Sequence, residues 1–329
     1  MSAIIAARGL RKHFTVKRGS LLKRTTTLVK AVDDVDLSIA PGETLGIVGE
    51  SGCGKTTVSR MLLLLDEPTA GTIEFKGTAL NSLRNDSLRA YRRAVQPVFQ
   101  NPFSSLDPRM NVGRIISEPL RASSSLRDAE IAQEVAAALL AVGLQALDAA
   151  KFPHEFSGGQ RQRIAIARAL ASNPQLIVLD EAVSSQDISI RAQILNLLKD
   201  LQEQRGLSYL FVAHDLATVR YLSDRVSVMY LGRIVETASA ETLFENPLHP
   251  YTQALLAACL PDDPDSLTES MGIAGEPPSP LDPPSGCHFR TRCPLATQAC
   301  AQTTPELREA AAGHWVRCVR VGSSSQAVT

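Results

Sequence analysis

The sequence predicts an α/β fold with a mainly parallel sheet, followed by a small irregular C-terminal tail, and three features indicate this organisation. Short apolar runs such as LIVLD at 176–180 alternate with segments of helical periodicity such as 188–204. A glycine-rich stretch, GESGCGKTT at 49–57, lies between an apolar run and a helical segment. Proline and glycine become dense after residue 260, which is typical of an irregular appendage. The 329 residues, 44% of them apolar, suffice for one large domain with an appended piece or for two domains.

The predicted elements follow from hydrophobic periodicity. Residues 32–39 alternate apolar and polar side chains, as a strand with one buried face does. Residues 112–147 are rich in Ala and Leu at helical spacing and interrupt the strand–helix alternation, so 101–160 is expected to be a separate helical subdomain. The remaining strands are expected at 44–49, 72–75, 176–180, 209–214 and 225–232, and the remaining helices at 55–65, 160–171 and 188–204.

Charge and hydropathy exclude some classes of protein. The 34 basic and 34 acidic residues cancel, so the charge gives no reason to expect nucleic-acid binding. The chain has no run of eighteen apolar residues, and its first twenty residues lack a continuous apolar core. The expectation is a cytosolic chain that touches a membrane only through partners.

Residues 49–57 fit the phosphate-binding pattern G-x-x-x-x-G-K-[ST]. Glycines allow backbone N–H groups to turn inward around phosphate oxygens, and the following helix directs its positive end at the same anion. Lys55 adds a full charge at the outer phosphates, and the Thr56 hydroxyl can reach Mg²⁺. The residues expected to bind ATP here are Gly49, Glu50, Ser51, Gly52, Cys53, Gly54, Lys55, Thr56 and Thr57.

A carboxylate at the end of a buried strand is needed to hold the Mg²⁺ water shell, and two segments compete for this role. LLLLDEPT at 62–69 directly follows the phosphate-loop helix, so its leucines are best explained as the core face of that helix. LIVLDE at 176–181 has the flanking turn residues of a strand. We therefore assign Asp180 to Mg²⁺ and Glu181 to activation of the attacking water.

The segment SGGQRQR at 157–163, together with the phosphate loop and His214, resembles the ATP-binding subunit of ABC transporters. The resemblance implies a RecA-like P-loop core at 1–100 and 161–250, a helical ABC subdomain at 101–160, and two subunits paired head to tail. Each ATP would then lie between the phosphate loop of one subunit and the SGGQ segment of the other. The residues of that segment are Ser157, Gly158, Gly159 and Gln160.

Other positions acquire roles through the same resemblance. Gln100 corresponds to the glutamine that senses Mg²⁺ and the attacking water, and the loop at 101–109 to the contact with membrane subunits. His214 corresponds to the histidine that contacts the γ-phosphate, and Phe14 to an aromatic that stacks on adenine. Residues 184–187 read SSQD where the family usually has SALD, which puts communication between the two ATP sites in question.

The C-terminal region, 251–329, narrows the resemblance. NPLHPYTQALL at 246–256 and GEPPSPLDPPSGCHFRTRCP at 275–294 resemble oligopeptide and dipeptide importer ATPases, and 12–23 resembles the second of their two paired ATPases. This implies an ATPase, with ATP and Mg²⁺ as cofactors, that acts as a translocase for di- or oligopeptides at the cytoplasmic face of the inner membrane. Nickel, glutathione or an antibiotic peptide as the solute, and a soluble non-transport ABC ATPase, remain alternatives.

The implied partners are a second ATPase subunit, two transmembrane permease subunits and an extracytoplasmic peptide-binding protein. A paralogue is favoured as the second ATPase, and a second copy of this chain remains open. Peptide length is not given by the sequence.

Four cysteines cluster in the C-terminal region with the spacing C-x5-C-x6-C-x17-C: Cys287, Cys293, Cys300 and Cys318. In a reducing compartment such a cluster indicates a metal before a disulfide. The spacing lacks the close pairs typical of zinc sites, so an iron–sulfur [4Fe–4S] cluster is favoured. Four unligated thiols and a zinc site remain the alternatives.

Overall fold

The computed structural model describes residues 3–18, 25–99, 106–123, 126–183, 186–259 and 275–321. These form two compact units, each built from three segments of the chain. The first unit comprises the described parts of Met1–Ala6, Ser38–Thr44 and Ile73–Ala213, and the second those of Ala7–Leu37, Leu45–Thr72 and His214–Thr329.

Parallel strands form the centre of the first unit. They are β6 (Val95–Phe99), β7 (Leu176–Asp180) and β8 (Ser208–Val212), in the order β8-β7-β6. All five residues of β7 and of β8 are buried, as expected for parallel strands covered on both faces. Phe99, Asp180 and Val212 lie in register at the carboxyl ends of the three strands, which places the predicted Mg²⁺ ligand at this end of the sheet.

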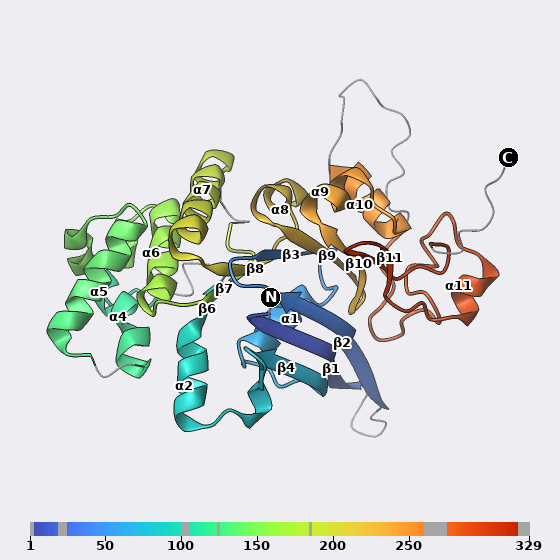
Figure 1. Ribbon diagram of the computed structural model, residues 1–329, viewed down its shortest axis with the longest axis horizontal. Coiled ribbons are helices and arrows are strands. Elements are labelled where there is room, and N and C mark those ends of the chain that lie inside the picture. Colours follow the sequence, from blue (N-terminus) through green and yellow to red (C-terminus); the bar gives the residue numbers. More distant parts are fainter. Residues whose placement is uncertain are drawn as a thin grey trace. The chain divides into compact units, whose positions relative to one another are not determined.

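Helices make up the rest of the first unit, and Figure 1 shows three of them, α4, α5 and α6, packed side by side. The predicted helical stretch at 112–147 is two helices, because Val142-Gly143 ends the second and the first ends before residue 126. The helices of this unit are α2 (Asn85–Ala94), α4 (Val112–Ser123), α5 (Asp128–Ala141), α6 (Gly158–Ala171) and α7 (Ile188–Arg205). Short 3₁₀ turns lie at Leu80–Ser82, Ala146–Ala150 and Pro153–Glu155.

The second unit contains five strands of a mixed sheet in the order β11-β12-β10-β9-β3. Strand β3 (Thr44–Val48) runs parallel to β9 (Arg225–Tyr230), and the next pairings are antiparallel. The outer strands are β10 (Arg233–Ser239), β12 (His314–Val316) and β11 (Arg308–Ala311). The C-terminal region thus adds strands to the sheet that carries the phosphate loop.

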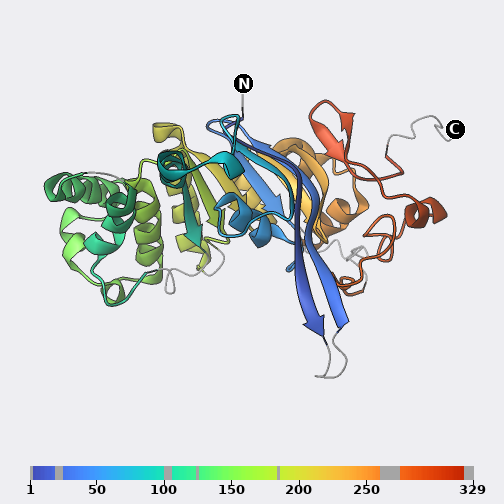
Figure 2. The same ribbon diagram turned by 90° about the horizontal axis from the view of Figure 1, so that it is seen from below.

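Strands β1 (Ile5–Arg18) and β2 (Thr25–Ile39) are long neighbours, and Figure 2 shows them running side by side. Strand β4 (Ala70–Phe75) lies next to β1 and pairs with β5 (Thr78–Ala79) through Phe75 and Thr78. The second unit also contains the helices α1 (Lys55–Leu62), α8 (Leu216–Leu222), α9 (Ala240–Glu245), α10 (Pro250–Cys259) and α11 (Gln298–Gln302).

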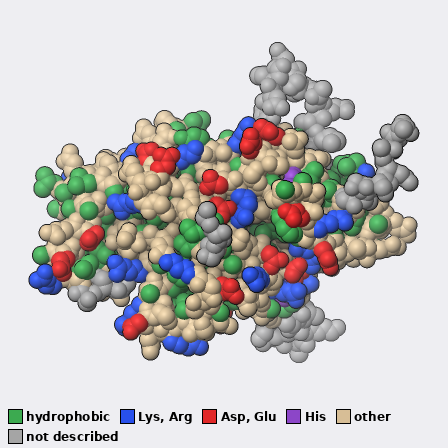
Figure 3. Space-filling model, viewed as in Figure 1, with side chains coloured by type: hydrophobic (Ala, Val, Ile, Leu, Met, Phe, Trp, Pro, Cys, Tyr) green, Lys and Arg blue, Asp and Glu red, His purple; other side chains and the backbone are tan. Residues whose placement is uncertain are grey.

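The predicted α/β class is confirmed. Every strand that periodicity predicted is present, although the strand predicted at 32–39 begins at Thr25. The phosphate-loop helix was predicted at 55–65 but ends at Leu62. Leu65, which follows it, is half exposed and does not continue the buried face of the helix. The domain boundaries at 100, 160 and 250 stay a prediction. On the face drawn in Figure 3, basic and acidic side chains are interspersed, in line with the zero formal net charge.

Candidate functional site

The phosphate loop joins the end of β3 to the start of α1 in the second unit. Gly49 has φ of 150° and Gly54 has φ of 113°, a region that favours glycine. A Cβ at Gly49 would lie 2.1 Å from the carbonyl oxygen of Met229, and one at Gly54 would lie 2.2 Å from that of Ala31. The loop therefore packs against the backbone on both sides in a way that only glycine permits.

Lys55 is buried and lies inside the loop. Its Nζ donates to the carbonyl oxygens of Gly49 at 2.7 Å and Glu50 at 3.0 Å. Ser51, Gly52 and Thr56 are exposed, so the outer side of the loop is accessible. A cationic group, flexible glycines and the first N–H groups of a helix gathered in this way form a binding site for a phosphate group.

Cys53 lies in the middle of the phosphate loop, and its side chain is buried. Burial raises the pKa of its thiol above the ordinary value, so it remains protonated at neutral pH. The Gly232 N–H donates to the Cys53 carbonyl at 2.8 Å, which joins the loop to the turn between β9 and β10. The role of Cys53 here is packing.

Phe14 lies on β1 with 39% of its surface exposed, which excludes a core role for its ring. Lys12 Nζ lies 5.2 Å from the ring centroid. The exposed face is available to stack on a base, in agreement with the predicted adenine contact, which stays a prediction.

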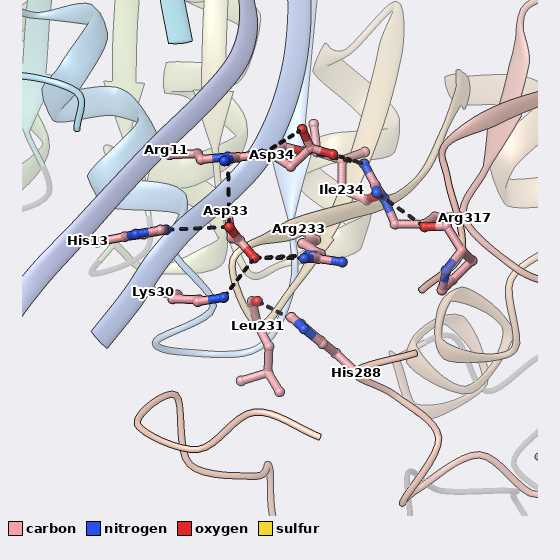
Figure 4. Close-up of polar contacts among 11 residues, drawn as sticks. Arg11, His13, Lys30, Asp33, Asp34, Leu231, Arg233, Ile234, His288 and Arg317 are labelled. Atoms are coloured by element: carbon pink, nitrogen blue, oxygen red, sulfur yellow. Dashed lines mark hydrogen bonds and ion pairs between the residues drawn. The ribbon is translucent and has the colours of Figure 1, made fainter. Parts of the chain in front are cut away.

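Asp33 of β2 is a buried carboxylate that contacts side chains of β1, the strand that carries Phe14, and of β10 (Figure 4). Arg233 of β10 donates to Asp33 at 2.7 Å, and His13 Nε2 lies 3.4 Å from it. Burial raises the pKa of Asp33, but the hydrogen bond and charge of Arg233, the charge of Lys30 and the hydrogen bond with His13 outweigh this and lower it below its usual value. Asp33 therefore stays ionised and ties β1, β2 and β10 together.

The acidic pair is in the first unit. Asp180 is the last residue of β7 and is 8% exposed. Glu181 follows with φ of 50°, a left-handed conformation that is unfavourable for a residue with a side chain, and its N–H donates to the Val212 carbonyl at 2.8 Å. Such local strain is often found where a side chain must be aimed for chemistry.

The competing segment at 62–69 is not a strand. It leaves α1 as a turn in which Arg60 Nε bonds to Asp66 at 2.6 Å and Lys12 bonds to the Glu67 carbonyl. Asp180 and Glu181 were preferred over this pair because a strand was predicted at 176–180. The structure contains that strand as β7.

The SGGQ segment begins α6 in the first unit. Ser157 is the N-cap: its Oγ accepts from the Gln160 N–H at 3.4 Å, and Gln160 Oε1 accepts from the Ser157 N–H at 3.0 Å. A Cβ at Gly159 would lie 2.7 Å from Ile190 of α7, so glycine is required for this packing. The predicted capping role of Ser157 is confirmed, and its contact with ATP stays a prediction.

The unusual residue of the SSQD segment, Gln186, lies against this helix start. Its Oε1 is 3.5 Å from the position of a Cβ at Gly158, and its carbonyl accepts from Arg191 at 3.2 Å. His214 lies two residues after the end of β8 and is exposed, and Asp215 caps α8 by accepting the N–H groups of Ala217 and Thr218. Gln100, most of the loop that follows it, and Ser184 lie outside the described residues.

The structure gives no support for a metal centre at the four C-terminal cysteines. Across the described ranges, no group of three or more His, Cys, Asp or Glu side chains is placed to hold a metal ion. Burial, aided by the neighbouring Cys318, Cys300 and Cys293, raises the pKa of the Cys287 thiol to about 11. The Cys300 and Cys318 side chains are buried and bear no disulfide. The predicted iron–sulfur cluster is therefore unsupported by the described residues.

Two residues that the sequence did not single out contact the phosphate loop. The Glu50 N–H donates to Tyr251 Oη at 2.9 Å, and Arg292 binds the Glu50 carboxylate. Both lie in the two C-terminal segments that carry the resemblance, 246–256 and 275–294, but nothing in those segments indicates a contact with Glu50.

Comparison with known proteins agrees with these features. Residues 32–184 match the family described as ABC transporter, and residues 235–300 match the oligopeptide/dipeptide transporter C-terminal region. A peptide import ATP-binding protein of Brucella ovis is 50% identical over 96% of this chain and 98% of its own. The oligopeptide transport ATP-binding protein AppF of Bacillus subtilis is 49% identical over 96% of each chain.

Solved structures show the same fold. An ATP-binding cassette dimer in a post-hydrolysis state, bound to ADP and phosphate, has a TM-score of 0.62 at 30% identity and is matched over 72% of this chain and 98% of its own. The protein cbiO1 of Clostridium perfringens, part of an ABC transporter complex, has a TM-score of 0.64 at 26% identity, over 75% and 92% of the two chains.

Proposed function

Because this chain belongs to the ATP-binding proteins of ABC transporters, we propose that it hydrolyses ATP to drive the import of dipeptides or oligopeptides. The observation that carries the ATPase activity is the phosphate loop, in which two glycines pack against backbone carbonyls and Lys55 lies inside the turn. The match of residues 235–300 to the oligopeptide/dipeptide transporter C-terminal region, and the names of the relatives, support peptides as the solute.

We infer the following roles for the residues that bind and hydrolyse ATP. The exposed ring of Phe14 stacks on adenine, and the N–H groups at 49–57 surround the phosphates. Thr56, Gln100 and Asp180 hold Mg²⁺, which neutralises charge on the phosphates when it is bound. Lys55 stabilises the outer phosphate as negative charge shifts during transfer.

The remaining steps belong to two side chains that follow buried strands. Glu181 accepts the proton of the attacking water, and its left-handed backbone fixes the direction of the carboxylate. His214 donates to the γ-phosphate. The segment from Ser157 to Gln160 faces the ATP held by the partner subunit, so full turnover requires two ATPase subunits.

The proposed partners are a second ATPase subunit, two permease subunits and a peptide-binding protein on the other side of the membrane. No helix in the described ranges is both long and apolar enough to cross a bilayer. We propose that the chain is attached to the cytoplasmic face of the membrane through the permease. The four C-terminal cysteines have no metal in this proposal.

Uptake of labelled peptides tests the function. In cells whose other peptide importers are deleted, the Lys55→Ala variant is compared with the intact chain for dipeptides and for longer peptides. Lys76→Ala serves as the control, because Lys76 is exposed and lies outside the loop. Loss of uptake with Lys55→Ala alone supports a peptide importer and defines the peptide length. Unchanged uptake of every peptide, with nickel or glutathione uptake lost instead, would contradict the choice of solute.

A further inference from the structure

A short part of the C-terminal region, the segment 286–292 (GCHFRTR), lies against the phosphate loop. Phe289 is 1% exposed, and its ring packs edge-on against Tyr230 and in a tilted arrangement against Tyr251, with 5.3 Å between centroids in each pair. Tyr230 and Tyr251 are themselves 4.6 Å apart. Buried aromatic pairs of this kind are worth about 1 kcal/mol each beyond their area, so Phe289 fixes the segment in place.

Arg292, three residues further along, forms a two-pronged ion pair with Glu50. Its two terminal nitrogens donate to Glu50 Oε2 at 2.7 Å and Oε1 at 3.0 Å. The Arg292 side chain is 5% exposed, and its guanidinium lies over the ring of Tyr230 and donates to the Gly275 carbonyl at 3.0 Å. A paired geometry with additional partners around the cation is the arrangement in which an Arg–carboxylate interaction fixes positions most strongly.

Glu50 connects this ion pair to Lys55. Its backbone N–H is held by Tyr251 Oη at 2.9 Å, and its carbonyl oxygen accepts from Lys55 Nζ at 3.0 Å. Both the side chain and the peptide of Glu50 are therefore fixed by the C-terminal half of the second unit. The same contact pairs the only acidic side chain within the loop, which would otherwise repel an anionic nucleotide.

Other contacts hold the C-terminal region to the same unit. Glu236 of β10 is fully buried and accepts from His314 Nε2 of β12 at 2.7 Å. Arg317 donates to the Ile234 carbonyl at 3.0 Å and lies 3.4 Å from Asp34, as Figure 4 shows. His288 Nδ1 lies 3.2 Å from the Leu231 carbonyl in the turn that also contacts the loop. These contacts hold the C-terminal region, which contains Arg292, to the unit that carries the phosphate loop.

We propose that Arg292 is a positioning residue for ATP binding: through Glu50 it holds the phosphate loop and Lys55 in the binding geometry and cancels the charge of Glu50. The C-terminal region then contributes directly to the nucleotide site of its own subunit. This inference deepens the proposed function and rests on ATP binding at the loop.

The test is ATP affinity of the full-length chain, measured with a fluorescent ATP analogue, and the ATPase kinetics of the assembled transporter. Arg292→Ala is expected to weaken binding and raise KM at least tenfold, with kcat at saturating ATP within about twofold of the intact protein. Arg292→Lys keeps the positive charge but lacks the two terminal nitrogens that bind Glu50 together. It is expected to bind ATP more tightly than Arg292→Ala and more weakly than the intact protein. Arg290→Ala is the matched control, because the described hydrogen bonds of the Arg290 side chain go to Ser285 and not to the phosphate loop.

A double-mutant cycle separates the ion pair from a general structural effect. Once Glu50→Ala has removed the carboxylate, Arg292→Ala is expected to have little further effect on ATP affinity. Equal losses from Arg292→Ala in both backgrounds, or a normal affinity of the single variant, would overturn the inference. A loss of kcat and of thermal stability with unchanged KM would also overturn it. Failure of the intact chain to bind ATP would instead reject the proposed function.

Discussion

Gly54→Ala is a substitution whose effect follows directly from the geometry of the loop. Gly54 is the last residue before α1 and has φ of 113°. Its new Cβ would lie 2.2 Å from the Ala31 carbonyl oxygen and 2.7 Å from Met229 Cε, whereas ordinary contact begins at 3.4 Å. The methionine tip can rotate away, but the carbonyl belongs to β2 and cannot. The loop must therefore move by more than 1 Å.

A displacement of this size is large compared with the tolerance of hydrogen bonds to phosphate. An error of about 1 Å in the placement of binding groups can cost on the order of 100-fold in function. The left-handed backbone adds about 1–3 kcal/mol of strain for a residue with a Cβ. We expect Gly54→Ala to weaken ATP binding about 100-fold and to lower the melting temperature.

The assay is titration of the full-length chain with a fluorescent ATP analogue, with thermal unfolding measured in parallel. Gly42→Ala is the matched control, because Gly42 also has a positive φ, of 76°, but a Cβ there meets nothing within 4 Å. The control is expected to lose about 1 kcal/mol of stability, because alanine is unfavourable in the left-handed region, and to bind ATP normally. Normal ATP binding by Gly54→Ala would refute the claim that glycine at this position is required by the packing of the loop.

Three further predictions address catalysis and stability. Glu181→Gln should bind ATP and stop turnover in the assembled transporter, and normal hydrolysis would return the assignment to Glu67. Glu236→Ala should lower the free energy of unfolding by about 3–5 kcal/mol, because the buried carboxylate accepts from Leu248, His249 and His314; a loss below 1 kcal/mol in urea unfolding would contradict this. Burial lowers the pKa of His249 to about 3, so from pH 7.5 to 5.5 the unfolded chain gains a proton that the folded chain does not, and stability should fall by about 1 kcal/mol. His249→Asn should remove this part of the pH dependence, and an unchanged pH dependence would exclude His249 as its source.

Much of the fold was predictable because its central strands are short, apolar and bounded by turn residues. The strands from Leu176 to Asp180 and from Thr44 to Val48 have all five residues buried, so their apolar runs are uninterrupted. Strand β1, by contrast, carries Arg8, Arg11 and Lys12 on a partly exposed surface. Because of this polar composition, hydrophobic periodicity did not predict the strand. Strands of such mixed composition give a weak periodic signal.

The phosphate site was predictable for a different reason. Its chemistry is local, since nine consecutive residues at 49–57 supply the glycines, the lysine and the threonine. Arg292 and Tyr251 were not predictable, because they reach Glu50 from 242 and 201 residues away along the chain. The cysteine spacing was a poor guide for a related reason. Spacing along the chain does not determine whether four sulfur atoms come together around one metal site.

The central claim, that this chain couples ATP hydrolysis to peptide import, is tested most directly in vesicles that contain the complete transporter. Hydrolysis and uptake are measured together with peptide-loaded binding protein on one side and ATP on the other. The account predicts that peptide raises hydrolysis, that labelled peptide accumulates only with ATP, and that both are lost with Glu181→Gln. ATP hydrolysis that is indifferent to peptide, with no accumulation, would contradict it.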